Sequence, residues 1–271
     1  MSRSASLLLI ALLIAAALSL LTPLDSLIEL RRTDPGLAWM LIEELRLPRT
    51  MLALGYGAVL GLAGAALQAT FANPLASPDV TGSSSGAALG AVAGAYWLGI
   101  TGPLALAICG AIGAGLALVA LFAVAGRRSE TATLLLAGVA IALAAGAGTS
   151  LLLALAPSPF AFYDSFEWLM GSFVDRSLPQ AAAALIPAAI ACGLLTRRAS
   201  ALDIMALGND VAASVGYRPR RLAIEVVALS AIAVGACVSV CGAIAFVGLI
   251  APFVARAMTV SYTHLTLPTK A

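Results

Sequence analysis

The sequence predicts an all-α protein that crosses a membrane several times, with about eight transmembrane helices. Its 271 residues are 61% hydrophobic and only 10% charged, and the mean hydropathy is +1.02. A soluble domain carries roughly a quarter charged residues, so this composition requires lipid as the solvent. Residues 50–78, 80–126 and 131–163 contain no charged side chain, and a spanning helix needs about 20 such residues.

The spans follow in order from the breaks between apolar runs. A signal peptide is the alternative for an N-terminal apolar segment. The first run is too long for one and more spans follow it, so we expect a transmembrane helix. A connector at 25–49 with five acids and four arginines separates it from the second span, which ends at Asn73-Pro74. Pro157 stops the fifth span, and residues 160–178 mix aromatic and charged side chains, as an interfacial segment does. The eight expected spans are 4–24, 50–70, 81–98, 104–125, 131–156, 179–196, 222–240 and 243–258.

The arginines orient the chain, because cytoplasmic connections carry an excess of them. With the N-terminus inside, the cytoplasmic connections hold nine arginines and the outer ones hold five. Four of those five share the 25–49 connector with five acids. The sequence therefore predicts a multi-pass inner-membrane protein with a cytoplasmic N-terminus.

The last eleven residues differ from the rest in their cations. All fourteen arginines precede residue 261, whereas the only lysine, Lys270, and the only histidine, His264, follow it. We expect residues 1–260 to form the transmembrane domain and 261–271 to be a non-native tail; an ordinary polar C-terminus is the alternative.

Glycines recur every fourth residue in two spans. This spacing places them on one helix stripe, where another backbone can approach closely. Such stripes are packing devices that suit any compact helical membrane protein. The helix-packing candidates are Gly57, Gly61, Gly82, Gly86, Gly90 and Gly94.

The chain lacks the residues for nucleotide hydrolysis or metal chemistry. A phosphate-binding loop needs a lysine, and the only lysine is Lys270. No cluster has metal-ligand spacing, and the four cysteines lie in apolar stretches as packing residues. We therefore expect no enzyme activity, catalytic residue, cofactor or metal site.

Apart from Arg256 near the end of the last expected span, Glu225 is the only charged residue inside these spans, and we expect it to pair at the membrane interface with the arginines of 218–221. Carriers powered by ion gradients usually keep ionisable groups at mid-membrane. Driven transport would therefore take its free energy from another subunit.

The polar stretch 199–221 predicts two short amphipathic helices. Residues 201–207 form the first, Gly208-Asn209 provide a break and N-cap, 211–215 form the second, and Gly216 is its C-cap. Their apolar faces are too short to span a membrane and favour a partner's groove. An interfacial loop lying on lipid is the alternative.

Several segments match one known pattern in order and spacing across residues 5–258. They are Arg46-Leu-Pro-Arg49-Thr50, Gly61-Leu-Ala-Gly64-Ala-Ala-Leu-Gln68, Asn73-Pro74-Leu-Ala-Ser-Pro78, Gly82-Ser-Ser-Ser-Gly86-Ala, Leu136-Ala-Gly138, Trp168-Leu-Met-Gly171-Ser172, Ala206-Leu-Gly208-Asn209-Asp210-Val-Ala-Ala-Ser214-Val-Gly216 and Phe246-Val-Gly-Leu-Ile250-Ala-Pro252. Together they resemble the FecCD family, permease subunits of bacterial ABC importers for iron–siderophore, haem and cobalamin.

The resemblance implies a type II ABC importer permease with about ten helices per subunit. Its implied partners are a second permease subunit (an identical copy or a close paralogue), a cytoplasmic ABC ATPase, a periplasmic or lipid-anchored substrate-binding protein and membrane lipid, but no nucleic acid. The substrate path would follow the interface between the two permease subunits.

The resemblance also assigns residues. Arg46 and Arg49 would receive acidic residues of the binding protein; the alternative is interfacial anchoring beside Glu43 and Glu44. The paired short helices would sit in a cleft of the ATPase. This ATPase-coupling segment comprises Ala201, Leu202, Met205, Leu207, Gly208, Asn209, Asp210, Val211, Ser214, Val215 and Gly216.

The family pattern continues beyond Arg256 with a polar loop and two more helices, which are absent here, so we expect a C-terminally truncated permease. Phe253 stands where the family often has histidine. Two other functions stay open: a self-contained secondary carrier or channel, which the broken second and third spans would suit, and an inactive fragment.

Overall fold

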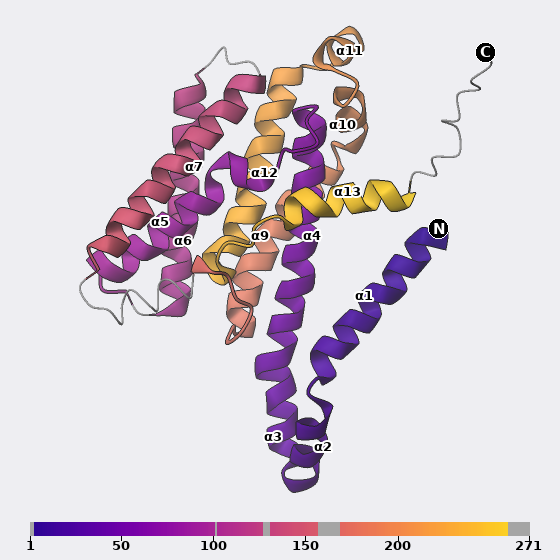
Figure 1. The fold of residues 1–271 in the computed structure, drawn as a ribbon, viewed down its shortest axis with the longest axis vertical. Coiled ribbons are helices and arrows are strands. Elements are labelled where there is room, and N and C mark those ends of the chain that lie inside the picture. Colours follow the sequence, from indigo (N-terminus) through magenta and orange to yellow (C-terminus); the bar gives the residue numbers. More distant parts are fainter. Residues whose placement is uncertain (1–2, 101, 127–130, 157–168, 260–271) are drawn as a thin grey trace, which may run out of the picture.

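The computed structural model describes residues 3–100, 102–126, 131–156 and 169–259, and every regular element in these ranges is a helix (Figure 1). The elements are α1 (Arg3–Leu21), α2 (Leu24–Thr33), α3 (Pro35–Met40), η1 (Leu41–Arg46), α4 (Leu47–Thr70), η2 (Pro78–Thr81), α5 (Ser83–Trp97), α6 (Pro103–Ala125), α7 (Thr131–Ala154), α9 (Leu178–Thr196), α10 (Ala199–Met205), α11 (Asn209–Ser214), α12 (Pro219–Cys241) and α13 (Val247–Thr259).

The all-α membrane fold is confirmed, and a helix occupies the position of each of the eight expected spans. Within the described ranges, five helical stretches are long and apolar enough to cross a bilayer: Pro35–Thr70, Leu104–Ala125, Ala132–Ala154, Leu178–Thr196 and Pro219–Cys241. The apolar stretches Leu8–Leu21 and Val247–Met258 are shorter. At 1.5 Å per residue, the 15 residues of α5 rise only about 22 Å, against a hydrocarbon core of about 30 Å.

Two expected boundaries are wrong. The second span, expected to begin at Thr50, begins earlier, because the 25–49 connector is helical as α2, α3 and η1 and continues directly into α4. The last span begins at Val247 rather than 243, because Gly242 ends α12 with a φ of 76° and Phe246 also has a positive φ, of 65°. A left-handed glycine is a common end for a helix.

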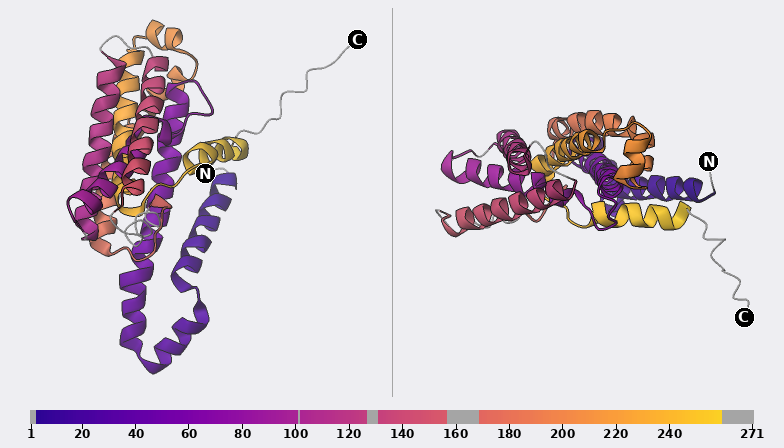
Figure 2. Two further views of the ribbon diagram at one scale, coloured as in Figure 1. Left: turned by 60° about the vertical axis from the view of Figure 1, so that its left-hand side comes forward. Right: turned by 90° about the horizontal axis from the view of Figure 1, so that it is seen from above.

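The helices have two distinct ends (Figures 1 and 2). Helices α10 and α11 lie at one end, together with the C-terminal end of α6. Helices α2 and α3 lie at the other end. The long α3–η1–α4 helix connects these levels, and its lower part extends beyond the other helices. In Figure 1, α4, α6 and α9 run toward the end that holds α10 and α11, and α7 and α12 run in the opposite direction.

α5 and α6 pack through glycine. A Cβ on Gly86 would lie 2.5 Å from the Cβ of Ala117, one on Gly94 would lie 2.8 Å from the Sγ of Cys109, and one on Gly90 would overlap the Cys109 carbonyl. Gly82 is not part of this stripe. It is the left-handed N-cap of α5, with a φ of 75°, and it packs against α7 at Gly138.

The other expected glycine stripe lies elsewhere on α4. A Cβ on Gly57 would meet nothing within 4 Å, and one on Gly61 would make only ordinary contact with Ala251, at 3.6 Å. The close approach occurs one turn later, where Gly64 faces the backbone of Gly248 in α13. The four-residue period predicted a glycine contact on α4 but not the glycine at which it occurs.

α12 is the most enclosed of the long helices, and it is bordered by α4, α5, α6 and α9. At its C-terminal end, Tyr56 of α4 is fully buried and donates a hydrogen bond from its hydroxyl to the Gly242 carbonyl at 3.3 Å. The Phe173 ring meets the Tyr56 ring edge-on, with 6.3 Å between centroids. This bond satisfies the hydroxyl, which would be costly to leave unpaired in an apolar interior.

Because of the α5–α6 crossing, we expect two glycines of α6 to respond differently to substitution by alanine. A Cβ on Gly113 would overlap the carbonyl of Gly86, whereas a Cβ on Gly115 would meet nothing within 4 Å. We expect Gly113→Ala to lower the free energy of unfolding in detergent by about 1–3 kcal/mol, the usual cost of overpacking. Gly115→Ala, its matched control, should be neutral or stabilising, because alanine is the better helix former. Equal unfolding midpoints for the two variants would contradict this crossing.

Candidate functional site

The polar stretch between α9 and α12 folds into the two short helices α10 and α11. Both begin about two residues earlier than expected. Gly208 separates them with a φ of 118° and is itself the N-cap of α11; Asn209 is the first helical residue rather than the cap. A side chain is disfavoured at such a φ, so glycine fits this turn.

α11 ends in a Schellman motif. The N–H of Gly216 donates to the Ala213 carbonyl and the N–H of Tyr217 to the Ala212 carbonyl, both at 3.0 Å. Gly216 has a φ of 93° and follows Val215, which is the C-cap. The C-cap expected from the sequence, Gly216, is thus one residue too far along the chain, although the left-handed glycine that the pattern requires is present.

One face of the two helices is anchored in the bundle. Leu202, Met205 and Ala212 are 8%, 1% and 0% exposed. They belong to an apolar cluster that includes Leu67 near the end of α4 and Leu195 at the end of α9. Burying a side chain of this size stabilises by about 1.5–3 kcal/mol, so α10 and α11 are fixed to the bundle.

The opposite face is exposed and partly apolar. Leu207, Val211 and Val215 are 71%, 41% and 61% exposed. The expected segment therefore divides into two sets. The anchoring set is Ala201, Leu202 and Met205, joined by Ala212; the exposed set is Leu207, Asn209, Asp210, Val211, Ser214, Val215 and Gly216, with Gly208 partly exposed at the turn.

Ion pairs fasten this end of the molecule. Glu225 of α12 pairs with Arg198 at 3.0 Å and with Arg221 at 3.1 Å, which confirms the pairing expected for it. Arg198 lies between α9 and α10, so the pair ties the start of α10 to α12. Arg220 also donates to the Gly126 carbonyl at the end of α6, at 3.5 Å. Five arginines of the described chain lie here: Arg197, Arg198, Arg218, Arg220 and Arg221.

Arg46 and Arg49 lie at the other end, beside the C-terminal end of α1. Arg46 is only 6% exposed, and its Nη1 donates to the Leu20 carbonyl at 2.9 Å. Arg49 donates to the Ser19 carbonyl at 3.0 Å. The last carbonyls of a helix have no intrahelical donors and carry partial negative charge, so the two guanidinium groups cap α1.

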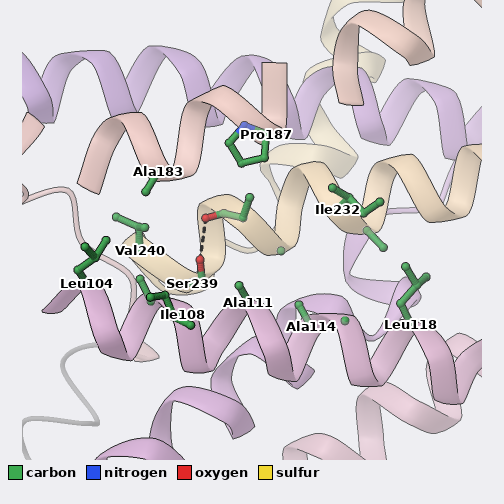
Figure 3. Close-up of a pocket in the computed structure, with 15 residues that line it drawn as sticks. Leu104, Ile108, Ala111, Ala114, Leu118, Ala183, Pro187, Ile232, Ser239 and Val240 are labelled. Atoms are coloured by element: carbon green, nitrogen blue, oxygen red, sulfur yellow. Dashed lines mark hydrogen bonds between the residues drawn. The ribbon is translucent and has the colours of Figure 1, made fainter. Parts of the chain in front are cut away.

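A groove of about 270 Å³ lies between α6, α9 and α12 (Figure 3). Ser239 is the only polar side chain among its lining residues, and its hydroxyl donates to the Ala236 carbonyl of its own helix at 2.8 Å. The groove therefore offers no free polar group to a charged solute. Within the described ranges, no three His, Cys, Asp or Glu side chains are grouped to hold a metal ion.

Composition and charge patterns did not single out Gln68. It is 4% exposed near the end of α4, and its Oε1 accepts a hydrogen bond from Arg256 of α13 at 2.6 Å. A signal was present, because Gln68 is the only side-chain amide in the apolar run before Asn73. Buried polar groups in membrane helices are expensive and commonly functional.

Asp79 is the other polar group that the sequence left unassigned. It lies in η2, in the connection between α4 and α5, and accepts a hydrogen bond from the Ser84 hydroxyl at 3.5 Å. Burial raises the pKa of the Asp79 carboxyl above its ordinary value, and the Ser84 hydrogen bond opposes the rise. Desolvation penalises the charged form of a carboxyl.

The comparisons with known proteins all identify the same family. The model of the FecCD transport family matches residues 5–271. The Fe(3+)-citrate import system permease protein YfmE of Bacillus subtilis is 34% identical over 236 residues, which cover 85% of this chain and 69% of the relative. The ferric enterobactin transport system permease protein FepD of Escherichia coli is 35% identical over 273 residues, covering 96% and 80%.

Two further comparisons agree. The cobalamin import system permease protein BtuC of Halobacterium salinarum is 34% identical over 243 residues, covering 88% of this chain and 64% of the relative. A solved structure, an inward-facing conformation of a metal-chelate type ABC transporter, superposes with a TM-score of 0.75 at 25% identity. That superposition covers 93% of this chain and 81% of the other.

The raised pKa of Asp79 predicts a pH-dependent stability. The unfolded carboxyl ionises near pH 4 (about 3.9 in model peptides), whereas the folded one stays protonated to higher pH. The folded state therefore binds more protons between these values, and stability is lost as pH rises through the raised pKa. We expect Asp79→Asn to unfold at a higher temperature than wild type at pH 7, with the gap closing as pH falls toward about 4.

The Ser84 hydroxyl supplies the control for this experiment. Ser84→Ala removes the hydrogen bond that opposes the rise of the Asp79 pKa, so the pH dependence of the unfolding temperature should become larger. A gap between Asp79→Asn and wild type that stays constant from about pH 4 to about pH 7 would contradict the burial of this carboxyl.

Proposed function

The chain belongs to the FecCD transport family, and we propose that it forms the path by which an ABC importer moves an iron chelate, or a related large cofactor such as haem or cobalamin, into the cytoplasm. Its relatives are permease subunits of importers for ferric citrate, ferric enterobactin and cobalamin. Permeases of this family are multi-pass inner-membrane proteins that work with a separate ATPase and a substrate-binding protein.

The observation that carries the proposal is the two-sided segment α10–α11. Its inner side is locked to the bundle by Leu202 and Met205, and its outer side presents Leu207 and Val215. An ATPase that binds the outer side would therefore displace the ends of the membrane helices rather than a loose loop. A loop that rests on lipid would meet anionic headgroups on the cytoplasmic leaflet, which the exposed carboxylate of Asp210 disfavours.

The end of the molecule that holds α10 and α11 also supports the proposed orientation of the chain in the membrane. The arginine-rich end of the described chain holds α10 and α11, and an excess of arginine is typical of the cytoplasmic side. α10 packs near the Thr70 end of α4, and α1 is a single helix that meets α4 near its opposite end through Arg46 and Arg49. The N-terminal end of α1 thus points to the α10 side, which supports a cytoplasmic N-terminus.

At the outer end, docking of a binding protein by Arg46 and Arg49 stays part of the proposal. Both guanidinium groups hold α1 carbonyls, and among the described residues neither is paired with Glu43 or Glu44. Docking would have to draw the more accessible Arg49 from the Ser19 carbonyl. A second permease subunit, identical or closely related, completes the proposed assembly and would form the substrate path together with this one.

A secondary carrier is the second candidate, because the chain breaks between α4 and α5 at η2, and broken helices build sites in carriers. Uptake into vesicles driven by an ion gradient, with neither ATP nor partners present, would favour it. The ABC importer proposal expects no such flux.

We predict that acidic substitutions on the exposed face of α10–α11 abolish binding of the ATPase. Leu207→Glu and Val215→Glu replace exposed apolar side chains and should each lower co-purification of the partner ATPase by about tenfold or more, because a charge buried at an apolar contact lacks a partner. Ser200→Glu is the matched control; it adds the same charge in the first turn of α10, where an acid favours the helix.

Both Glu variants should insert and unfold like wild type, since neither position is buried. Undiminished co-purification of the ATPase with Leu207→Glu and Val215→Glu would remove α10–α11 as the contact.

A further inference from the structure

The last two turns of α4 contact two different parts of the molecule on adjacent faces. On one face, Leu67 is fully buried in the cluster that holds Leu202 and Met205 of α10. On the other face, Gly64 and Gln68, four residues apart and therefore on one stripe, meet α13. The end of α4 thus lies between α10 and α13.

The contact with α13 depends on particular residue types. Pro252 has no N–H, so it cannot donate to the carbonyl of Gly248 four residues earlier. That carbonyl lies where the Cβ of any larger residue at position 64 would be. A Cβ on Gly248 would in turn lie 2.6 Å from Cδ of Pro78, the first residue of η2. Glycine at 64 and at 248 therefore allows the two backbones to meet.

Gln68 then joins both ends of α13 to α4. Its Nε2 donates to the Leu249 carbonyl in the first turn of α13 at 3.3 Å, and its Oε1 accepts from Nη2 of Arg256 in the last turn at 2.6 Å. The second bond is short and charge-assisted, the stronger kind. A glutamine uses both its donor and its acceptor here, which an apolar residue of similar size could not do.

In the described structure, α13 packs mainly on α4. It also meets Pro78 of η2 and touches α1 only lightly, and Figure 1 shows it lying at a steep angle to α4 and extending away from α5, α6 and α7. An element held mainly through one neighbour moves with that neighbour. Elements that move in switching are drawn from such weakly supported parts.

We propose that Gln68 is a positioning residue that makes α13 follow the movement of α10–α11. The ATPase displaces α10–α11, the buried contact with Leu67 displaces the end of α4, and the Gln68 bonds displace α13. This inference rests on the proposed function, because it takes the motion from the partner ATPase. It needs no knowledge of which solute is carried.

The test follows α13 directly in the complex with the ATPase. A cysteine at Met258, which is 42% exposed in the last turn of α13, reports α13 through its rate of alkylation by N-ethylmaleimide, with and without ATP. Protein lacking this cysteine gives the background from Cys109 and Cys192, which are partly exposed. In the Met258→Cys protein, we expect ATP to change the rate by about threefold or more, as a coupling free energy of typical size would.

Three variants are compared in this background. Gln68→Leu should abolish the ATP-dependent change while the ATPase still binds and hydrolyses ATP. Gln68→Glu keeps the acceptor for Arg256 but cannot donate to the Leu249 carbonyl, so it should keep part of the change. Thr70→Val is the control on the same helix end, because the Thr70 hydroxyl bonds only its own helix, at the Ala66 carbonyl.

The outcomes distinguish a failure of the inference about Gln68 from a failure of the proposed function. An ATP-dependent rate that is unchanged in Gln68→Leu overturns the inference, and so does the absence of any change in the Met258→Cys protein while bound ATPase hydrolyses ATP. A Gln68→Leu protein that loses ATPase binding together with the change shows a structural role and also overturns it. Failure of the ATPase to bind the otherwise unaltered chain overturns the proposed function itself.

Discussion

The proposed coupling depends on one interaction, the burial of α10 against the adjacent ends of α4, α9 and α12. Leu202 and Met205 enter the apolar cluster that contains Leu67 and Leu195, and the Glu225 ion pairs hold the start of α10 from the other side. Without this anchor the segment would be a surface loop, and force applied to it would not reach the membrane helices. With it, the proposed ATPase contact outside the membrane would displace helix ends inside it.

The membrane part must transmit that displacement without a hydrophobic drive between its helices, because lipid is as apolar as the side chains. The structure meets this constraint with close backbone contacts. Gly86 and Gly90 fit against α6, and Gly64 fits against Gly248. Polar groups are few and are used at the joints: the Tyr56 hydroxyl at the end of α12, and Gln68 at the α4–α13 crossing.

Much of the fold could be predicted from the sequence, because lipid imposes long apolar helices whose breaks are visible as Pro, Gly and charges. The positions of α6, α7, α9 and α12 follow from these signals. The sequence could not show which glycine lies at a crossing, so Gly64 was missed, nor that the charged 25–49 connector is helical. Long-range pairing was also invisible: Arg46 caps α1 and Gln68 meets Arg256, 188 residues away.

The most direct test of the central claim is the side of the membrane on which α11 lies. A cysteine at Asn209, an exposed position, can be labelled with a membrane-impermeant maleimide in intact cells and in inverted vesicles, with the unaltered chain as background. The account predicts labelling in inverted vesicles and none in intact cells. Labelling from outside intact cells would place α10–α11 beyond the reach of any cytoplasmic ATPase and would contradict it.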